Sequence, residues 1–231
     1  KNGTVNTITQ GIQKIGILIK DKKIVAMGEK LNSLSTEFVL DGEVIGREDD
    51  YEELNKELRA NGEFDFDPNT DTLEIIDAQG QFIYPGFIDA HTHLGLWEDG
   101  MGVEGADGNE ETDPITPHLN VIDGINPMDR TFKEAYEGGI TAVCTTPGSA
   151  NVMGGQAAAI KTFGRRIDKM IIKNPVASKV AFGENPKSCY GSNDDTPQTR
   201  MAIAALLREN LRKAEEYLFD LKSAEEDEDI D

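Results

Sequence analysis

From Pro85 onward, short apolar segments with strand character alternate with segments of helical character. Phe87 to Ala90 and Ile140 to Cys144 are typical of buried strands, and Phe132 to Gly138 between them is typical of a helix. Further along, the pattern predicts a helix at Gln156 to Phe163, strands at Met170 to Ile172 and Val180 to Phe182, and a long final helix. Strands that alternate with helices favour an α/β fold with a parallel sheet.

The residues before Pro85 predict a separate β domain. Residues 12–27, IQKIGILIKDKKIVAM, alternate apolar and polar residues on both sides of a turn at Asp21 to Lys23, which is typical of a β-hairpin. Strand character returns at Leu73 to Asp77 and at Gln81 to Tyr84, with a turn at Gly80.

A strongly charged insertion near 41–72 interrupts this β domain. It contains a segment at Tyr51 to Arg59 that we expect to be helical and to stop at Asn61-Gly62. The sequence therefore predicts one domain at 1–84, with the insertion, and a second domain at 85–231.

The final helix has a predicted start and an apolar stripe. Thr196 is expected to cap it, with Pro197 at the first helical position. The stripe consists of Leu207, Leu211, Ala214, Leu218 and Leu221. A helix packed on its own sheet is the expected arrangement, and a partner-binding face is the alternative. The acidic run AEEDEDID at the end is expected to be solvated.

The charge balance restricts the class of partner. The formal net charge is −20 and the sequence pI is about 4.5, so nucleic acid and an anionic membrane surface would both repel the chain. Small molecules or cationic groups are the expected partners. No apolar run approaches the roughly 20 residues that a membrane helix needs, and we expect a soluble, cytoplasmic protein. Cys144 and Cys189 are expected to be buried free thiols.

Two of the three histidines, His91 and His93, stand one residue apart in YPGFIDAHTHLG. Residues i and i+2 of a strand point to the same face about 6.5 to 7 Å apart, so both rings can reach one divalent metal ion. Imidazole suits zinc, iron, nickel and copper alike, which leaves the metal open. Manganese is a further candidate. An H-x-H triplet also arises by chance, but the end of a strand in an α/β sheet is where such folds place their active sites.

YPGFIDAHTHLG resembles the signature of the amidohydrolase superfamily, P-G-x-I-D-x-H-x-H at the end of the first strand of a (β/α)8 barrel. IGILIKDKKIVAMGE and IIDAQGQFIYPG are similar to the small β-sandwich that precedes that barrel. GGITAVCTTPGSANVMGGQAAAIKTFG and AFGENPKSCYG resemble the imidazolonepropionase-like, cyclic amidohydrolase branch. The resemblance implies a β-sandwich followed by a partial barrel. Such barrels need about 250 residues, so the 147 residues from Pro85 onward suffice for the first three or four βα units.

The resemblance also implies a set of site residues. His91 and His93 would be two ligands of a divalent metal, most simply zinc, and Glu184 would supply a third ligand from the place where some amidohydrolases carry a carboxylate. The alternative for Glu184 is a surface contact with Lys187. Asp89, two residues before His91, is expected to play a structural hydrogen-bonding role.

A role in substrate binding is less sharply indicated. His118, in the loop TDPITPHLN, is expected to face the substrate, with a hydrogen bond to the backbone as the alternative. The general acid/base of the family lies on later strands, so no catalytic residue is assigned. Loops 95–112 and 147–155 are expected to line the pocket.

The implied function is hydrolysis of the C–N bond of an amide or cyclic amide by a metal-activated water. A prolidase-like dipeptidase is the alternative within the enzymes, and it would need a second metal and a bridging carboxylate or carboxylated lysine. A non-catalytic fragment or assembly subunit is the alternative outside them. A small-molecule substrate, and either a homo-oligomer or the remainder of the chain's own barrel, are the expected partners.

Two glycine-rich stretches resemble ligand-binding loops. Gly100 to Gly105 fits G-x-G-x-x-G, but it does not open a helix after a strand, and acidic neighbours would repel a pyrophosphate. We expect a flexible loop there. Gly154-Gly155 precedes the helix expected at Gln156 to Phe163, where helix amides holding an anion and a simple tight turn are both open.

Overall fold

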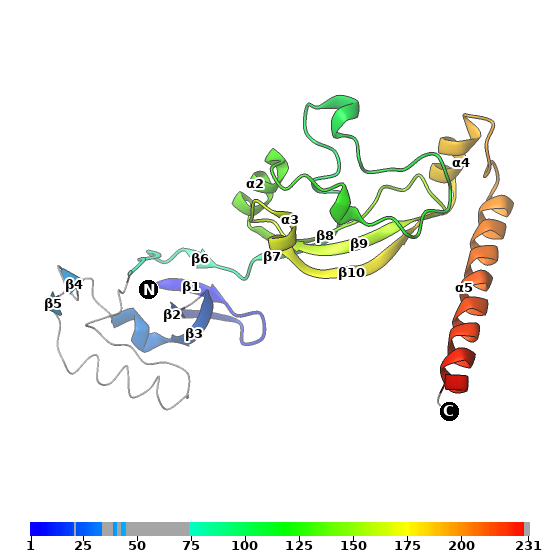
Figure 1. Ribbon diagram of the computed structural model, residues 1–231. Helices are drawn as coiled ribbons and strands as arrows, with labels where there is room; N and C mark the ends of the chain where they lie inside the picture. The colour runs from blue at the N-terminus through cyan, green and yellow to red at the C-terminus, as the bar shows by residue number, and fades with distance from the viewer. Residues whose placement is uncertain (21, 34–38, 41–42, 45–73, 229–231) are drawn as a thin grey trace. The chain divides into compact units, whose positions relative to one another are not determined.

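The computed structural model describes residues 1–20, 22–33, 39–40, 43–44 and 74–228 (Figure 1). These residues form two compact units, Lys1–Pro85 and Gly86–Asp231. The helix expected at Tyr51 to Arg59 and most of the insertion near 41–72 lie outside the described residues.

The first unit is built on a four-stranded sheet with the order β3-β2-β1-β6. The predicted hairpin is confirmed, with Lys20 opposite Lys23 and Lys22 in the turn at a φ of 66°. β1 runs antiparallel to β2 and parallel to β6. The elements are β1 (Gly3–Asn6), β2 (Ile12–Lys20), β3 (Lys23–Gly28), η1 (Glu29–Ser33), β4 (Val39–Leu40), β5 (Glu43–Val44) and β6 (Phe82–Ile83).

The strand expected at Leu73 to Asp77 is absent over Glu74 to Asp77, which the structure describes. The polar groups of this segment bond instead to the start of the chain. The N-terminal ammonium group of Lys1 donates to the Ile76 carbonyl at 2.7 Å, and the side-chain amide of Asn2 donates to the Asp77 carboxylate at 3.1 Å. Because these bonds take the place of a ladder, the segment closes the unit around its N-terminus without forming a strand.

The second unit begins with the expected βαβ arrangement. β7 (Phe87–Thr92) and β8 (Ile140–Thr145) are parallel neighbours, and α2 (Arg130–Glu137) lies between them in the chain. The Asp129 carboxylate accepts a hydrogen bond from the Thr131 amide at 3.1 Å and so caps α2.

The strands that follow do not continue the parallel pattern. β9 (Met153–Lys161) is a strand antiparallel to β8, so the helix expected at Gln156 to Phe163 is wrong. α3 (Ile167–Met170) leads into β10 (Ile171–Val180), a single strand antiparallel to β9 where two short strands were expected. The order is β10-β9-β8-β7, and the described residues contain one βα unit in place of the three or four expected. The partial (β/α)8 barrel stays a prediction.

The core of this unit lies on one face of the sheet. Figure 1 shows α2, α3 and the long loop between β7 and α2 on the same face. η4 (Val121–Asp123) lies in that loop. The buried cluster joins this loop and the helices to β8 and β9, through Leu96, Val121, Ile125, Phe132, Val143, Ala158, Ile160 and Met170.

Two helices end the chain, α4 (Glu184–Gly191) and α5 (Arg200–Glu228). α5 begins three residues later than a start at Pro197, and Thr199 caps it by accepting a hydrogen bond from the Ala202 amide at 3.1 Å. Thr196 is therefore not the cap. No described helix is long and apolar enough to cross a membrane.

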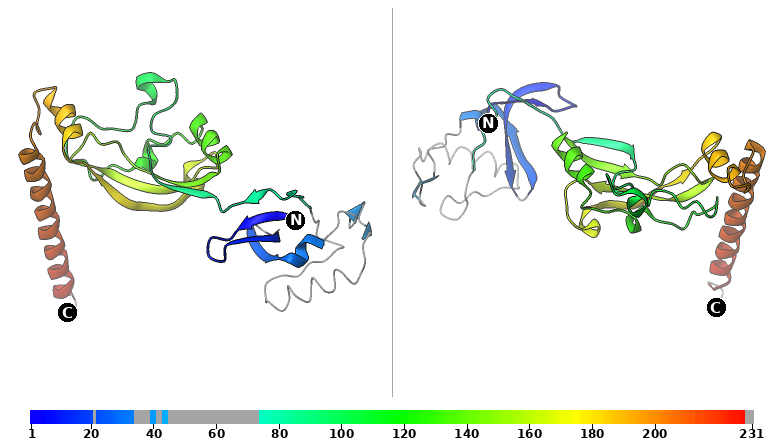
Figure 2. Two further views of the ribbon diagram at one scale, coloured as in Figure 1. Left: turned by 180° about the vertical axis from the view of Figure 1, so that it is seen from behind. Right: turned by 90° about the horizontal axis from the view of Figure 1, so that it is seen from above.

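Only the start of α5 packs against the rest of its unit. Ile203 is buried, but every side chain from residue 211 to residue 222 is exposed, including Leu211 and Leu218 on the stripe. Figure 1 and Figure 2 show α5 leaving the sheet beside α4. The expectation that the stripe packs on the chain's own sheet is therefore wrong for this part of the helix, because none of the described strands covers it.

Candidate functional site

The two histidines lie together at the end of β7. His91 is on the strand and His93 follows its last residue, and their ring centroids are 5.5 Å apart with the rings at 80° to each other. The strand spacing that predicted two neighbouring rings is therefore seen in the structure. This separation allows one nitrogen of each ring to face a common ion.

The His93 ring is held in one orientation. Its Nδ1 lies 2.8 Å from the Thr146 carbonyl oxygen, just after the end of β8. A carbonyl only accepts, so Nδ1 carries the proton and Nε2 keeps its lone pair. The Trp97 ring packs edge-on against His93 at a centroid distance of 5.2 Å. A backbone carbonyl on one ring nitrogen is the usual support of a metal-ligating histidine, so His93 fits a divalent metal at Nε2.

His91 is engaged differently. Its Nε2 lies 3.3 Å from the Lys179 Nζ, and burial lowers the pKa of Lys179. An ammonium group donates and cannot accept, so the lone pair of His91 Nε2 points at the lysine. A metal ion at this nitrogen requires that Lys179 move aside or lose its proton.

The contact between His91 and Lys179 shows that the sheet is curled. His91 is on β7 and Lys179 is on β10, the two edge strands of the four-stranded sheet. Three strand spacings in a flat sheet amount to roughly 14 Å. The two side chains meet over one face, as they do when a sheet begins to close on itself.

The other predicted site residues do not join His91 and His93 in a metal-binding group within the described ranges. Glu184 is the first residue of α4 and is exposed. In the described ranges, no three His, Cys, Asp or Glu side chains form a group that could hold a metal ion. His118 is exposed in the loop before η4. The Asp89 carboxylate accepts a hydrogen bond from the His91 amide at 3.1 Å, as expected of a structural residue.

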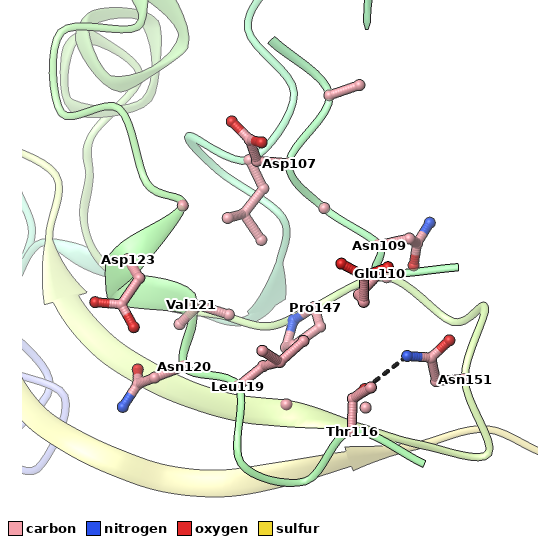
Figure 3. Close-up of a pocket in the computed structure, with 17 residues that line it drawn as sticks. Asp107, Asn109, Glu110, Thr116, Leu119, Asn120, Val121, Asp123, Pro147 and Asn151 are labelled. Carbon is pink, nitrogen blue, oxygen red and sulfur yellow. Dashed lines mark hydrogen bonds between the residues drawn. The ribbon is translucent and has the colours of Figure 1, made fainter. Parts of the chain in front are cut away.

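A pocket of about 240 Å³ lies beside the histidines' strand and is lined by three loops (Figure 3). Loops 95–112 and 147–155 both contribute, as predicted, and the third is the segment from Thr116 to Gly124. His118 is not among its lining residues, although its neighbours Thr116 and Leu119 are. Figure 3 shows Asp107, Glu110 and Asp123 on different sides of the pocket.

The pocket is acidic. None of the described residues that line it is Lys, Arg or His, and none of its three carboxylates forms an ion pair within the described ranges. Hydrogen bonds from the Thr112 hydroxyl and amide lower the pKa of Glu110, so this carboxyl is charged at neutral pH. The lining therefore favours neutral or cationic groups over anions.

A buried hydrogen-bond chain forms one wall of this pocket. The Tyr190 hydroxyl donates to the Asn151 Oδ1 at 2.6 Å, and the Asn151 Nδ2 donates to the Thr116 hydroxyl at 2.7 Å. Burial, followed by the nearby Cys189 and acidic side chains, raises the pKa of Tyr190, so its hydroxyl keeps its proton. These hydrogen bonds connect α4 to two of the three loops that line the pocket.

Trp97 connects the histidines to the pocket. Its ring contacts His93 on one side and packs so closely on Gly108 that a Cβ there would lie 2.0 Å from the ring. Gly108 lines the pocket, and its carbonyl accepts a hydrogen bond from the Gly148 amide of the neighbouring loop at 2.7 Å. Trp97 is the single tryptophan of the chain, so its fluorescence reports on this region.

The two glycine-rich stretches have structural explanations. Gly102–Gly105 forms the 3-10 helix η3 and opens no α-helix, consistent with the rejection of a dinucleotide site. Gly154 and Gly155 lie within β9, so the helix start that would have held an anion does not exist. A Cβ at Gly155 would lie 2.5 Å from the Leu119 carbonyl oxygen, so glycine is needed for close approach and not for a turn.

Several residues of the site are not apparent from the sequence. Lys179 lies on β10, in the gap between the two short strands that the sequence pattern predicts there. Asn151, Thr116 and Tyr190 are far apart in the chain. Their segments meet at the start of β9, where the Thr116 amide donates to the Met153 carbonyl at 2.7 Å and the Ala181 amide, just before α4, donates to the Val152 carbonyl at 3.2 Å. Trp97 follows the histidine pair closely, and its place in the chain is the one available clue.

Comparison with known proteins gives two matches. No family model matches the chain. The chain is 34% identical over 156 residues to amidohydrolase tasK of Hapsidospora irregularis. The aligned region covers 62% of this chain and 16% of tasK. An amidohydrolase from Thermotoga maritima MSB8 of known structure is 33% identical, with a TM-score of 0.72.

The structural match covers 98% of this chain and 49% of the Thermotoga protein. This chain therefore spans about half the length of the Thermotoga protein and a smaller share of tasK. The mixed α/β arrangement, with two four-stranded sheets and the β4-β5 pair, matches that amidohydrolase structure. The two matches, together with the histidine pair at the end of β7, make this chain similar to known amidohydrolases.

Proposed function

We propose that this chain supplies the first metal ligands of a hydrolase that cleaves the C–N bond of an amide or cyclic amide. The observation that carries the proposal is the geometry of His93, whose Nδ1 is anchored on the Thr146 carbonyl while its ring lies 5.5 Å from that of His91. A divalent metal held there, most simply zinc, would polarise the carbonyl and activate water for attack. The similarity to two amidohydrolases supports the same class of reaction.

The chain's own residues would orient and admit the substrate. The Thr146 carbonyl and the Trp97 ring fix the plane of the His93 imidazole, so its lone pair needs no reorientation on binding. The acidic pocket beside Trp97 would take the body of the substrate, and its carboxylates favour a neutral or cationic amide.

Metal titration of the purified protein tests the proposal. Zn²⁺ binding is measured by calorimetry, and Co²⁺ binding by quenching of Trp97 fluorescence. We expect His91→Ala and His93→Ala each to weaken binding by more than about tenfold, because each removes one donor of the site. His118→Ala is the matched control, since His118 is exposed and outside the pair.

If His91→Ala, His93→Ala and His118→Ala all bind metal as tightly as the wild-type protein, the proposed metal site is wrong. The reaction class is tested separately, by assaying the whole protein to which this chain belongs, loaded with metal, against a panel of cyclic amides and dipeptides for release of the amine. Metal binding without release of amine from any member of the panel would leave the metal site standing and overturn the assignment of C–N hydrolysis.

A two-metal, prolidase-like dipeptidase is the second candidate, and Lys179 is the observation that favours it. Its Nζ lies 3.3 Å from His91 Nε2, where a lysine that had taken up CO2 as a carbamate would place a carboxylate beside the histidines. We expect this candidate to bind two metal ions per chain in the presence of bicarbonate, and Lys179→Arg to bind one. A single ion in both proteins would favour the one-metal hydrolase.

A further inference from the structure

The apolar stripe of α5 has the spacing of a helix-pairing seam. Its five residues, Leu207, Leu211, Ala214, Leu218 and Leu221, follow one another at alternating steps of four and three. That period of 3.5 residues is the spacing of a coiled-coil seam. From Leu207 to Ala214 the residues between the seam positions are polar or charged, and further along Tyr217 and Phe219 add exposed apolar surface beside it. The spacing points to another helix as partner.

The seam is free over most of its length. Leu211 is 53% exposed, Leu218 52% and Leu221 43%, in a stretch where every side chain from residue 211 to residue 222 is exposed. A shallow hollow lies over the small side chain of Ala214, and Leu211 and Leu218 flank it. A hollow between two leucines on a helix surface is the hole into which a partner side chain inserts.

We propose that α5 pairs in antiparallel orientation with α5 of a second copy of this chain, with the twofold axis between Arg212 and Lys213. In this register Leu211 inserts over the partner's Ala214, and Leu207 faces the partner's Leu218. Each small residue of the seam then meets a leucine, so the layers have similar volumes. The twofold axis repeats every contact, as in most homodimers.

Charge complementarity fixes the same register. The positions beside the seam carry Arg208 and Glu215, which form no ion pair within the described part of the chain. The antiparallel register sets Arg208 against the partner's Glu215 on both sides of the axis. A parallel pair would instead set Ala214 against the partner's Ala214, which leaves a gap, and would bring no opposite charges together at these positions.

A charge-reversal series tests the proposal. The oligomeric state of the 231-residue protein is measured by sedimentation equilibrium in 0.15 M salt (about physiological ionic strength), with a dimer expected, twice the chain mass of 25.3 kDa. Arg208→Glu or Glu215→Arg places like charges opposite each other and is expected to raise the dimer Kd at least about tenfold. The double variant R208E/E215R restores opposite pairs and is expected to recover most of the lost affinity.

Glu216→Arg is the matched control, because it makes the same change of charge as Glu215→Arg on the side of the helix away from the seam. It is expected to leave the Kd within about threefold. Circular dichroism confirms that each variant keeps its helix. A wild-type monomer throughout the micromolar range would overturn the proposal, including the case in which another segment of a longer protein covers the seam. A dimer insensitive to the reversals, or a double variant no better than the singles, would also overturn it.

Discussion

At the scale of single residues, the hydroxyl of Tyr190 closes a buried chain of polar groups behind the pocket. Tyr190→Phe would leave the Asn151 Oδ1 without its donor at 2.6 Å, and both side chains are buried. We expect a loss of roughly 1–3 kcal/mol in the free energy of unfolding, the usual penalty for a buried unsatisfied group. Urea denaturation measures it.

Tyr217→Phe is the control for that measurement. Tyr217 is 66% exposed on α5, and its hydroxyl is expected to contribute less than about 0.5 kcal/mol. A Tyr190 variant as stable as the Tyr217 variant would mean that water replaces the lost donor.

The two thiols are predicted to react slowly. Burial raises the pKa of Cys144, and burial together with the Glu111 carboxylate raises the pKa of Cys189. Only a thiolate attacks iodoacetamide, so at pH 8 less than about a tenth of each thiol is reactive, and the rate should still be rising above pH 9. Peptide mapping after timed alkylation follows each cysteine separately.

Glu111→Gln separates the causes of that slowness. Removing the carboxylate takes away the negative charge and the hydrogen bond that hold the proton on Cys189, so its pKa falls and its alkylation accelerates. Cys144, whose pKa is raised by burial alone, serves as internal control and keeps its rate. Acceleration of both thiols would indicate a general loosening of the unit.

The sequence could predict His91 and His93 as a pair because the period of a strand acts within three residues. It could not predict that Lys179 meets His91, because that contact depends on the curl of a sheet whose edge strands are about ninety residues apart in the chain. Residue types and spacing thus indicated the histidine pair but not its neighbours.

At the scale of elements, β9 is a strand because of what surrounds it. Its centre, Gln156 to Ile160, is rich in alanine, which favours helices in isolation. In the structure Ala157 and Ala158 are fully buried between β8, β10 and the pocket loops. Small side chains permit this double cover, and tertiary packing outweighs the local preference. The local sequence of β9 does not show that β8, β10 and the pocket loops will surround it.

Two adjacent glycines of β9 should respond differently to substitution. Gly155→Ala would place a Cβ 2.5 Å from the Leu119 carbonyl oxygen, a contact that only a shift of the pocket loop can relieve. We expect a loss of about 1–3 kcal/mol in unfolding free energy. Gly154→Ala is the matched control, because its nearest neighbour would be the Lys179 Cβ at an ordinary 3.4 Å. Thermal unfolding of both variants decides, and equal losses would contradict the close approach.

At the scale of the whole molecule, the excess of negative charge works against the folded state. The chain carries 43 acidic and 23 basic side chains, for a net charge of −20 at pH 7. Mutual repulsion disfavours the compact state, and salt screens it. We expect the melting temperature to rise as NaCl is raised from about 0.01 M to 0.15 M, where the Debye length falls from about 30 to 8 Å. A melting temperature that falls with salt would show that attractive ion pairs outweigh the repulsion.

The order of elements was predictable over β7, α2 and β8, where one helix connects two parallel strands. It was not predictable beyond Thr145, where the chain turns back on itself and the sheet becomes antiparallel. The structure that contains these two four-stranded sheets matches the Thermotoga amidohydrolase with a TM-score of 0.72.

Because His91 and Lys179 meet across the sheet, the two inner strands determine how far apart these residues lie. β8 and β9 carry neither side chain, yet their curvature sets the distance between β7 and β10 that the lysine side chain must reach across. A bulkier residue in place of Ala157 or Ala158, fully enclosed within β9, would flatten that arc and draw the amine away from the ring. Access of an ion to His91 would then be governed from a strand that never touches it.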